Sequence, residues 1–324
     1  MELRRYLSDS DARVWAKLEA ANPGGSAKDR PAARMIGDAI AEGLIEPGGT
    51  VIESSSGNMG VGLAQACRYH GLSLICVVDS RAHGTNLGTM RALGADVRLV
   101  TDPDPETGDL LTARLNLVRE LVDRTPGAFW PDQYGNRSNP AAHTLGTMRE
   151  IDEALDGDLD YLIVATSTTG TLRGCRDYLR DRERRTQVVA VDAVGSSLFG
   201  GKPGPRRIPG LGAGFETPLS RSEDHDILVR VDDLHCVVGC RRLVEREAIF
   251  AGGSSGGVAL ALETVAPLMA PGSRCALILP DGGAGYLDSA YDDEWVSEQL
   301  GAAPDDLRAM VAGDARLAPP SMAI

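Results

Sequence analysis

Short aliphatic runs alternate along most of this chain with longer segments in which apolar residues recur every three or four positions. Most of the short runs are rich in Val, Ile and Leu and show little alternation with polar residues, as strands buried on both faces do. Six strands are predicted in this way, at residues 50–53, 74–78, 96–100, 161–165, 187–192 and 274–279. Because strands that alternate with helices form mostly parallel sheets covered by helices on both faces, the sequence predicts an α/β fold.

Glycines mark the ends of two predicted helices. The segment Asn58–His70 is followed by Gly71, and the segment 85–93 is followed by Gly94. Glycine readily adopts the left-handed backbone that ends a helix. In an open α/β sheet, ligands bind beyond the carboxyl ends of the strands, so functional residues are expected in the loops that lead from strands into helices.

The composition disfavours several classes of protein. A formal net charge of −13 without any block of basic residues argues against nucleic acid as a partner. The first residues, MELRRYLSDSD, carry charges where a signal peptide needs an apolar stretch, and no apolar run approaches the ~18 residues of a membrane span. Among the six cysteines, Cys236 and Cys240 are four residues apart, but no second Cys or His pair at metal-ligand spacing accompanies them. The sequence therefore predicts a cytoplasmic protein with reduced, mostly buried thiols and no metal site.

Two loops in the first half of the chain could carry chemistry. NPGGSAKDR (Asn22–Arg30) places Lys28 just before a helix that begins near Pro31, where the helix dipole favours loss of the lysine proton. Such a lysine suits a nucleophile and base, although an exposed lysine in a glycine turn is the alternative. ESSSGNMG (Glu53–Gly60) offers hydroxyls and backbone N–H groups that would bind a carboxylate, or else form an ordinary helix cap.

Two further loops lie in the second half. STTGT (Ser167–Thr171) follows a predicted strand, and its hydroxyls and N–H groups would hold a phosphate or cap the next helix. GGSSGG (Gly252–Gly257) also precedes a helix, and its glycines permit close approach of a flat ligand or mark a flexible turn. None of the four loops matches a dinucleotide fingerprint or a Walker loop. A dinucleotide or ATP site is therefore disfavoured.

The remaining segments indicate how the chain is organised. SNPAAH interrupts the pattern and suggests a domain boundary near residue 140. The region 195–216 is rich in Gly, Pro and Arg and is predicted to be an ordered active-site loop or lid. The tail after about residue 305 is expected to be peripheral.

The order and spacing of the four loops resemble the cysteine synthase family of pyridoxal-phosphate enzymes, which has the fold of the tryptophan synthase β-subunit. The resemblance runs from about Arg13 to about Tyr291. Within the family the chain is most similar to the enzymes that make N-(2-amino-2-carboxyethyl)-L-glutamate, a precursor of 2,3-diaminopropionate in siderophores and peptide antibiotics. The motifs that carry this similarity include NPGGSAKDRPA, CVVDSRAHGTNL, STTGT, VDAVGSSLFGGKP and RIPGLGAG.

The resemblance implies a role for each residue that matches a family motif. Lys28 is the Schiff-base and catalytic lysine, Asn58 contacts the phenolic oxygen of the cofactor, and Ser254 meets its pyridine nitrogen. The phosphate of the cofactor is held by Ser167, Thr168, Thr169, Gly170 and Thr171. The residues implied in binding the substrate carboxylate are Ser55, Ser56, Gly57, Met59 and Gln133. Tyr134 is a candidate for contacts to the donor, and Arg206 and Arg207 are candidates for the further carboxylates and the phosphate of the substrates. For the two arginines, solvated surface side chains are the alternative.

The resemblance also implies an architecture. Fold type II consists of two lobes, each with a mostly parallel sheet flanked by helices. Residues 30–140 would form a smaller, mobile lobe that closes on the substrate, and residues 1–29 with 141–305 a larger cofactor-binding lobe, leaving 306–324 as a peripheral tail. A homodimer is expected. One departure from the family pattern is PDGGAGYL, in which Gly285 replaces an arginine.

The implied reaction is β-replacement through an α-aminoacrylate. O-Phospho-L-serine would be the donor, the α-amine of L-glutamate the acceptor, and phosphate the leaving group. One alternative is a cysteine synthase that uses O-acetylserine or O-phosphoserine and sulfide. A second is a family member without catalytic activity that binds and regulates a partner.

Overall fold

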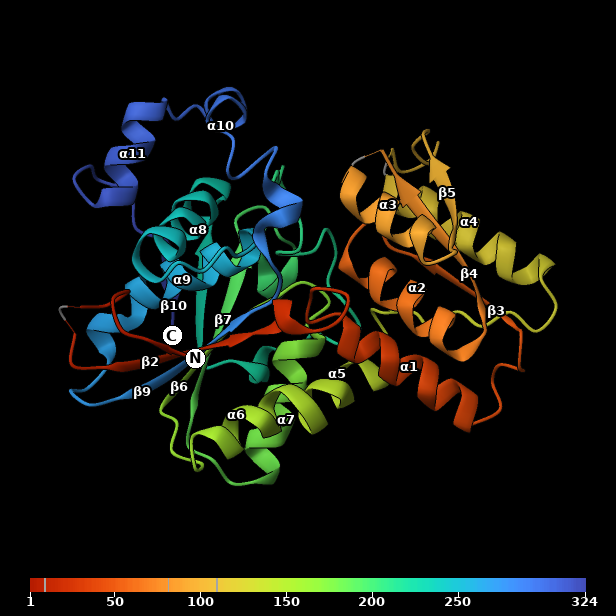
Figure 1. Cartoon of the computed structure of the whole chain (residues 1–324), viewed down its shortest axis with the longest axis horizontal. Coiled ribbons are helices and arrows are strands. Elements are labelled where there is room, and N and C mark those ends of the chain that lie inside the picture. Colours follow the sequence, from red (N-terminus) through yellow and green to blue (C-terminus); the bar gives the residue numbers. More distant parts are fainter. Residues whose placement is uncertain (9, 81, 109) are drawn as a thin grey trace. The chain divides into compact units, whose positions relative to one another are not determined.

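A computed structural model describes residues 1–8, 10–80, 82–108 and 110–324. The chain forms two compact units, which Figure 1 shows in sequence colours. The larger unit comprises Met1–Ala21 and Ala142–Ile324, and the smaller unit comprises Asn22–Ala141. The predicted lobe limits at 29/30 and 140/141, and the closing movement assigned to the smaller lobe, stay predictions.

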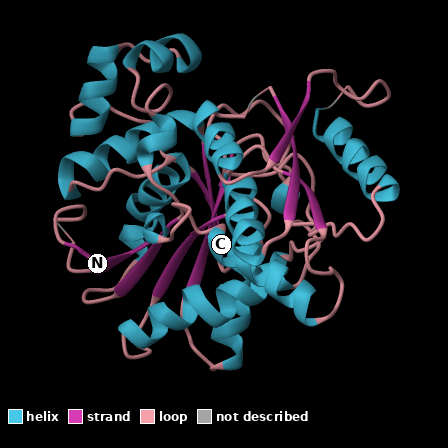
Figure 2. Cartoon of the chain, turned by 45° about the vertical axis from the view of Figure 1, so that its right-hand side comes forward, coloured by secondary structure: helices cyan, strands magenta, loops and turns pink. Residues whose placement is uncertain are grey.

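A seven-stranded sheet forms the centre of the larger unit. Its strands, in spatial order, are β1 (Glu2–Leu3), β2 (Arg13–Leu18), β9 (Arg274–Leu279), β6 (Tyr161–Ala165), β7 (Gln187–Ala193), β8 (Ile227–Val231) and β10 (Ser321–Ala323). The five inner strands are parallel, and only β1 and β10 at the two edges are antiparallel to their neighbours. Figure 2 shows this row of strands with helices on both sides.

Helices cover both faces of this sheet. The chain returns to this unit at Ala142, the last residue of α5 (Ser138–Ala142). A π-helical turn at His143–Met148 follows, and then α6 (Arg149–Ala154) and α7 (Gly170–Asp181). Later come α8 (Asp233–Glu247), α9 (Gly253–Val265), α10 (Asp293–Leu300) and α11 (Pro304–Ala312). Short 3-10 turns lie at Glu19–Ala21, Leu198–Gly200, Ser222–Asp224, Ala266–Leu268 and Gly283–Tyr286.

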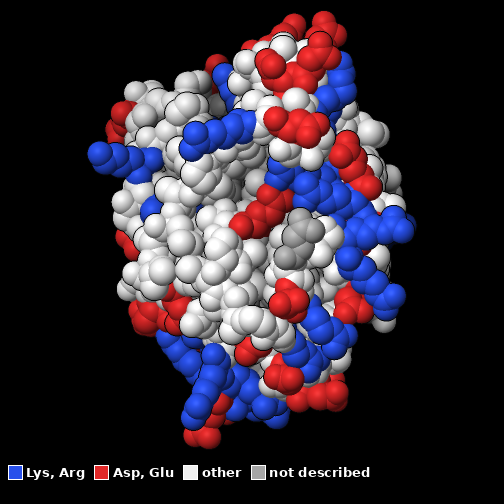
Figure 3. Space-filling model, turned by 90° about the vertical axis from the view of Figure 1, so that its left-hand side faces the viewer, with Lys and Arg blue, Asp and Glu red and all other residues white. Residues whose placement is uncertain are grey.

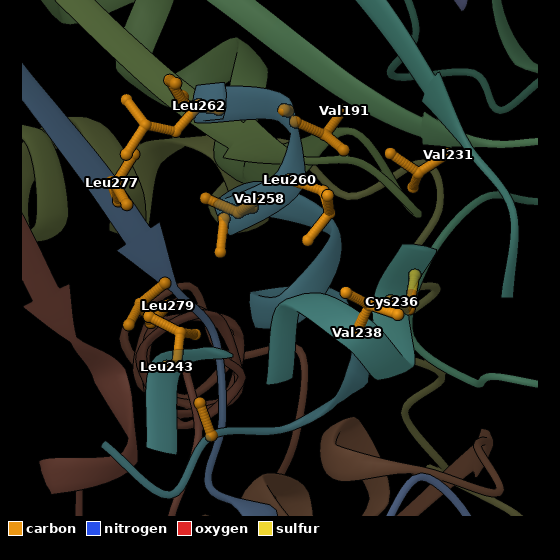
Figure 4. Packing of buried hydrophobic residues seen from close by; sticks show 14 of the residues in the cluster. Val191, Val231, Cys236, Val238, Leu243, Val258, Leu260, Leu262, Leu277 and Leu279 are labelled. Carbon is orange, nitrogen blue, oxygen red and sulfur yellow. The ribbon is translucent and has the colours of Figure 1, made fainter. Parts of the chain in front are cut away.

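Alternate residues of β6 explain why this strand reads as a continuous apolar run. Tyr161 and Ile163 belong to the core beneath α8 and α9, whereas Leu162 and Val164 belong to the core beneath α6 and α7. Both faces of the strand are therefore buried, as predicted for a parallel sheet. Figure 4 shows the first of these cores, where aliphatic side chains of α8 and α9 pack on those of β7, β8 and β9.

The smaller unit contains a three-stranded parallel sheet in the order β3 (Thr50–Ser54), β4 (Ser73–Asp79) and β5 (Asp96–Val100). Its helices are α1 (Asp29–Ala41), α2 (Asn58–His70), α3 (Gly84–Ala92) and α4 (Leu110–Arg124). Alternate side chains of β3 and β4 belong to two different hydrophobic cores. One core also contains residues of α1, α2 and α3, and the other contains residues of α4. The predicted fold class, mostly parallel sheets flanked by helices, is confirmed.

The structure adds strands that the sequence analysis missed. The strand β2 escaped notice because Arg13 and Lys17 interrupt its apolar residues, as suits a strand that is only partly buried. The C-terminal segment, expected to be peripheral, contributes β10 to one edge of the sheet. In addition, Leu307 and Val311 of α11 are buried in the core of the larger unit.

The surface and the thiols agree with the chain's composition. All six cysteines are buried and free, as predicted. On the face shown in Figure 3, basic and acidic side chains are interspersed around a broad uncharged area. Across residues 1–8, 10–80, 82–108 and 110–324, no helix is long and apolar enough to cross a bilayer. Nor do these residues contain a cluster of three His, Cys, Asp or Glu suited to a metal ion.

Candidate active site

The loop expected to bind a carboxylate leads from β3 into α2 in the smaller unit. The Ser55 hydroxyl accepts a hydrogen bond from the backbone N–H of Gly60 at 2.9 Å. This bond takes up one backbone N–H of the first turn of α2, although the N-cap residue itself is Gly57 and has no side-chain cap. The turn itself presents backbone N–H groups at the positive end of a 13-residue helix, where an anion is stabilised. Gly57 and Asn58 lie in this turn, partly exposed.

Ser56 is held by an ion pair that the sequence analysis did not anticipate. Its Oγ accepts hydrogen bonds from Nη1 of Arg114 at 3.0 Å and from the backbone N–H of Asp79 at 3.2 Å. Nε of Arg114 lies 3.3 Å from Oδ2 of Asp79, and their side chains are only 10% and 2% exposed. A nearly buried arginine therefore stands next to the candidate carboxylate loop. No local signal marks it, because Arg114 is 58 residues away from Ser56 along the chain.

Two other predicted substrate residues are buried in this unit. Met59 is 2% exposed and its side chain belongs to the hydrophobic core, so only its backbone is suited to contact a polar ligand. Gln133 is 5% exposed, and its side-chain amide donates to the carbonyl oxygen of Ser54 at 3.0 Å. Gln133 is thus joined directly to the start of the carboxylate loop. Tyr134 follows it and is half-buried.

Lys28 occupies the N-cap position of α1 and is half-buried. Its backbone N–H donates to the Ser26 hydroxyl at 3.2 Å, and its carbonyl accepts from Ala32 at 3.0 Å. A Cβ atom added to Gly62 of α2 would lie 3.0 Å from the Lys28 carbonyl oxygen. The backbone around Lys28 is therefore fixed by α1 on one side and by close packing of α2 on the other.

Glu53, at the end of β3, is a buried carboxyl group that lies at the base of the same loop. It is 1% exposed, and burial raises its pKa from 4.5 to about 7, against the lowering effect of hydrogen bonds from Ser54, Gln133 and Trp130. The cost of removing the charge from water exceeds the gain from these donors. Glu53 opens the ESSSGNMG motif, but nothing in the sequence indicates a role for its side chain.

The raised pKa predicts a pH-dependent stability. Because the folded protein binds the Glu53 proton more tightly than the unfolded chain does, the stability from this group is complete below pH 4.5 and is lost as the pH rises through 7. Between pH 4.5 and 8 the wild-type free energy of unfolding should fall by on the order of 3 kcal/mol relative to a Glu53→Gln variant. Urea unfolding at a series of pH values measures this difference. Parallel pH curves for the two proteins would contradict it.

The expected phosphate loop lies in the larger unit, between β6 and α7. Thr169 has a left-handed backbone with φ of 66°, which is rare for a β-branched residue and persists only where the surroundings hold it. Its Oγ1 donates to the Thr168 carbonyl oxygen at 2.7 Å and lies 3.2 Å from Oγ1 of Thr217. Thr217 also donates to that carbonyl, at 3.2 Å. Thr169 is the N-cap residue of α7, which begins at Gly170.

The outer residues of this loop are also placed by the fold. Oγ1 of Thr171 lies 3.2 Å from Nε2 of the buried His143, whose Nδ1 lies 2.9 Å from Oγ1 of Thr147. Ser167 is half-buried just after β6. The Thr168 hydroxyl accepts from the backbone N–H of Gly170 at 3.4 Å, so the hydroxyls of Thr168, Thr169 and Thr171 all stabilise the loop. The N-terminus of the 12-residue helix α7 that follows is an end at which an anion is stabilised.

Ser254 lies in the first turn of α9 and is 2% exposed. The loop at 208–212 passes beside it, since a Cβ atom added to Gly210 would lie 4.0 Å from Oγ of Ser254 and 3.9 Å from the Tyr286 hydroxyl. A side chain at Gly210 would occupy the space next to the Ser254 hydroxyl. Gly210 therefore leaves the vicinity of the Ser254 hydroxyl clear of a side chain.

The two candidate arginines differ in their surroundings. Arg206 is half-buried, and its Nη1 donates to the Leu211 carbonyl oxygen at 3.1 Å, which stabilises the loop from within. Arg207 is exposed, and its backbone N–H donates to Asp233 at 2.8 Å. Arg207 is thus the more accessible of the two guanidinium groups.

The residues of the larger unit fit a pyridoxal phosphate. They provide the N-terminus of α7 for its phosphate, the Ser254 hydroxyl for its ring nitrogen, and beside that hydroxyl a glycine, Gly210, which puts no side chain in the way of a ring. The predicted residues Lys28, Asn58, Ser55, Ser56, Gly57, Met59, Gln133 and Tyr134 belong to the smaller unit, whereas 167–171, Arg206, Arg207 and Ser254 belong to the larger.

Comparisons with known proteins support the expected relationship. The family model described as "Pyridoxal-phosphate dependent enzyme" matches residues 1–281. The chain is 47% identical over 297 residues to N-(2-amino-2-carboxyethyl)-L-glutamate synthase of Ralstonia nicotianae, covering 92% of this chain and 88% of that protein.

Solved structures share both the fold and part of the sequence. The crystal structure of O-ureido-L-serine synthase is similar with a TM-score of 0.81 and 32% identity, over 92% of this chain and 95% of that one. O-acetylserine sulfhydrylase isoform 3 of Entamoeba histolytica is similar with a TM-score of 0.81 and 33% identity, over 89% and 87% of the two chains. The fold is therefore type II, as expected.

Proposed function

Because the chain belongs to the family of pyridoxal-phosphate dependent enzymes, we propose that it joins O-phospho-L-serine to the α-amine of L-glutamate. The products would be N-(2-amino-2-carboxyethyl)-L-glutamate and phosphate. The observation that carries this proposal is the similarity to the Ralstonia nicotianae synthase, which extends over most of both chains. The backbone N–H groups at the start of α2 suit the donor's carboxylate.

Pyridoxal phosphate supplies an electron sink for the amino-acid donor when it is bound. In our assignment, Nζ of Lys28 holds the cofactor, takes the proton from Cα of the donor and later returns it. Oγ of Ser254 would meet the ring nitrogen as a neutral hydroxyl, which, unlike a carboxylate, does not force that nitrogen to be protonated and so would favour β-replacement over transamination. Asn58 would contact the phenolic oxygen, and residues 167–171 would hold the phosphate.

The substrate contacts are assigned by the same reasoning. The turn from Ser55 to Met59 binds the donor carboxylate through its backbone N–H groups, and Gln133 supports that turn through its bond to Ser54. Tyr134 and Ser167 are candidates for contacts to the donor's leaving group. Arg206 and Arg207 are candidates for the carboxylates of glutamate, because guanidinium pairs with carboxylate in a bidentate manner.

The wider biological setting is inferred from the same relationship. We propose a cytoplasmic homodimer in which the smaller lobe closes on the substrate. Its product would feed the biosynthesis of 2,3-diaminopropionate for a siderophore or a peptide antibiotic.

A cysteine synthase is the second candidate. Similarity to the O-acetylserine sulfhydrylase of Entamoeba histolytica favours it, because that enzyme has the same fold at 33% identity. In this case sulfide, rather than glutamate, would be the acceptor.

Rapid mixing distinguishes the two candidates. The absorbance band of the holoenzyme should change when O-phosphoserine is added, and it should return when glutamate follows. The expected product is N-(2-amino-2-carboxyethyl)-L-glutamate, which mass spectrometry identifies. If O-acetylserine alone changes the band and only sulfide restores it, the protein is a cysteine synthase. If no donor changes the band, the remaining alternative is a regulatory protein that has lost turnover.

A further inference from the structure

The buried carboxyl group of Glu53 joins two segments that our proposed function places at the substrate. Its Oε1 accepts hydrogen bonds from the backbone N–H of Ser54 at 2.8 Å and from Nε1 of Trp130 at 3.2 Å. Its Oε2 accepts from the backbone N–H of Gln133 at 3.1 Å. Both oxygens of the side chain therefore receive hydrogen bonds, and every one of these partners is a donor.

The same two segments are connected a second time. Nε2 of Gln133 donates to the Ser54 carbonyl oxygen at 3.0 Å, and Nδ2 of Asn139 donates to the Gln133 carbonyl oxygen at 2.8 Å. The backbone and the side chain of Gln133 are thus both tied to residues 53 and 54, at the start of the carboxylate loop. A buried network of this kind rigidifies the groups that it contains only while each donor keeps its acceptor.

We propose that Glu53 is a positioning residue, which sets the carboxylate loop and Gln133 in the arrangement that binds the carboxylate of the amino-acid donor. This inference rests on the proposed function in one respect, namely that the turn from Ser55 to Met59 receives the donor. Glu53 itself touches neither substrate nor cofactor in this view. It acts through the backbone of Ser54 and Gln133.

Glu53→Gln tests the proposal with little change in shape. One end of the new amide is a donor, and it faces a donor wherever it points, so at least one backbone N–H loses its acceptor. The least disruptive orientation keeps the amide oxygen on Ser54 and Trp130 and leaves the N–H of Gln133 without a partner. The expected result is a donor KM at least about tenfold higher, with kcat within about threefold of wild type, because uniform binding is lost and chemistry is not.

Trp130→Phe is the matched control, because it removes one donor to the same carboxylate but leaves the bonds to Ser54 and Gln133 in place. We expect it to change KM by less than about threefold. A Gln133→Ala background supplies a second control. If Glu53 acts through Gln133, the substitution Glu53→Gln should raise KM much less in that background than in the wild type.

Hydrogen exchange measures the positioning without any turnover. Peptides covering residues 53–60 and 130–135 of the holoenzyme should exchange faster in Glu53→Gln, and other peptides should be unchanged. If exchange becomes faster throughout the protein in Glu53→Gln, the variant Glu53→Asp is used in its place. The shorter side chain keeps the carboxyl group but does not span both backbone donors, so it should raise KM by a smaller factor.

The outcomes separate this inference from the proposed function. KM is measured with whichever O-substituted serine the enzyme uses, so failure of O-phosphoserine and glutamate removes the proposed function and leaves the test of Glu53 intact. An unchanged KM in Glu53→Gln overturns the positioning role. An equal rise in the Gln133→Ala background overturns the part of that role that runs through the Gln133 side chain and supports the part that runs through the bond to Ser54. If no donor is turned over, exchange decides: local acceleration supports the role, and wild-type exchange in both peptides overturns it.

Discussion

Replacing Lys28 by Ala is expected to lower turnover by about 10³-fold or more, because the protein would lose both its covalent hold on the cofactor and the base for the Cα proton. The chain contains only three lysines, Lys17, Lys28 and Lys202, which makes the assignment easy to test. Lys17 lies within β2 and is paired with Glu150, and Lys202 is exposed on the loop after β7. Lys28 alone precedes a helix at the loop expected to hold the cofactor.

Borohydride reduction of the holoenzyme gives a readout that does not depend on turnover. The reduction fixes the cofactor permanently to its lysine, and peptide mass spectrometry should find it on Lys28. The matched control Lys202→Ala should fold with wild-type stability and remain labelled at Lys28. Label on Lys17 or Lys202, or more than a tenth of wild-type turnover in Lys28→Ala, would refute the assignment.

Gly239→Ala is expected to destabilise the protein by about 2–4 kcal/mol, because the helices α8 and α9 touch through their backbones. A Cβ atom on Gly239 would lie 2.0 Å from the Gly256 carbonyl oxygen, and one on Gly256 would lie 2.0 Å from the Cys236 carbonyl oxygen. Neither contact can be relieved by rotating a side chain. The close approach also fixes the start of α9 and hence the position of Ser254.

The control for this prediction is the same substitution at a glycine with free space. Gly37 lies inside α1, and a Cβ atom there would meet nothing within 4 Å. Gly37→Ala should therefore stabilise the protein by about 0.5–1 kcal/mol, since alanine favours the helix. Urea unfolding of the two variants measures both effects. Similar free energies of unfolding for the two would show that α8 and α9 can separate at little cost.

Much of the fold follows from local patterns. The helix predicted at Asn58–His70 has those bounds in the structure, and Gly71 ends it with a left-handed backbone at φ of 69°. The strand predicted at 161–165 is β6, because a buried parallel strand needs apolar residues on both faces. The strand β8 was missed although its sequence, ILVRV, is also apolar.

The amino-acid sequence by itself determined the fold class and the family, and it marked the loops in which we propose that the chemistry resides. These properties depend on the spacing of residues within a few turns or strands, which a sequence displays directly. Tertiary structure alone decided which distant side chains form hydrogen bonds with those loops. Arg114 meets Ser56 across 58 residues, and Gln133 meets Glu53 across 80, so no periodicity connects them. Burial then sets the pKa of Glu53, because desolvation exists only once the chain has folded around it.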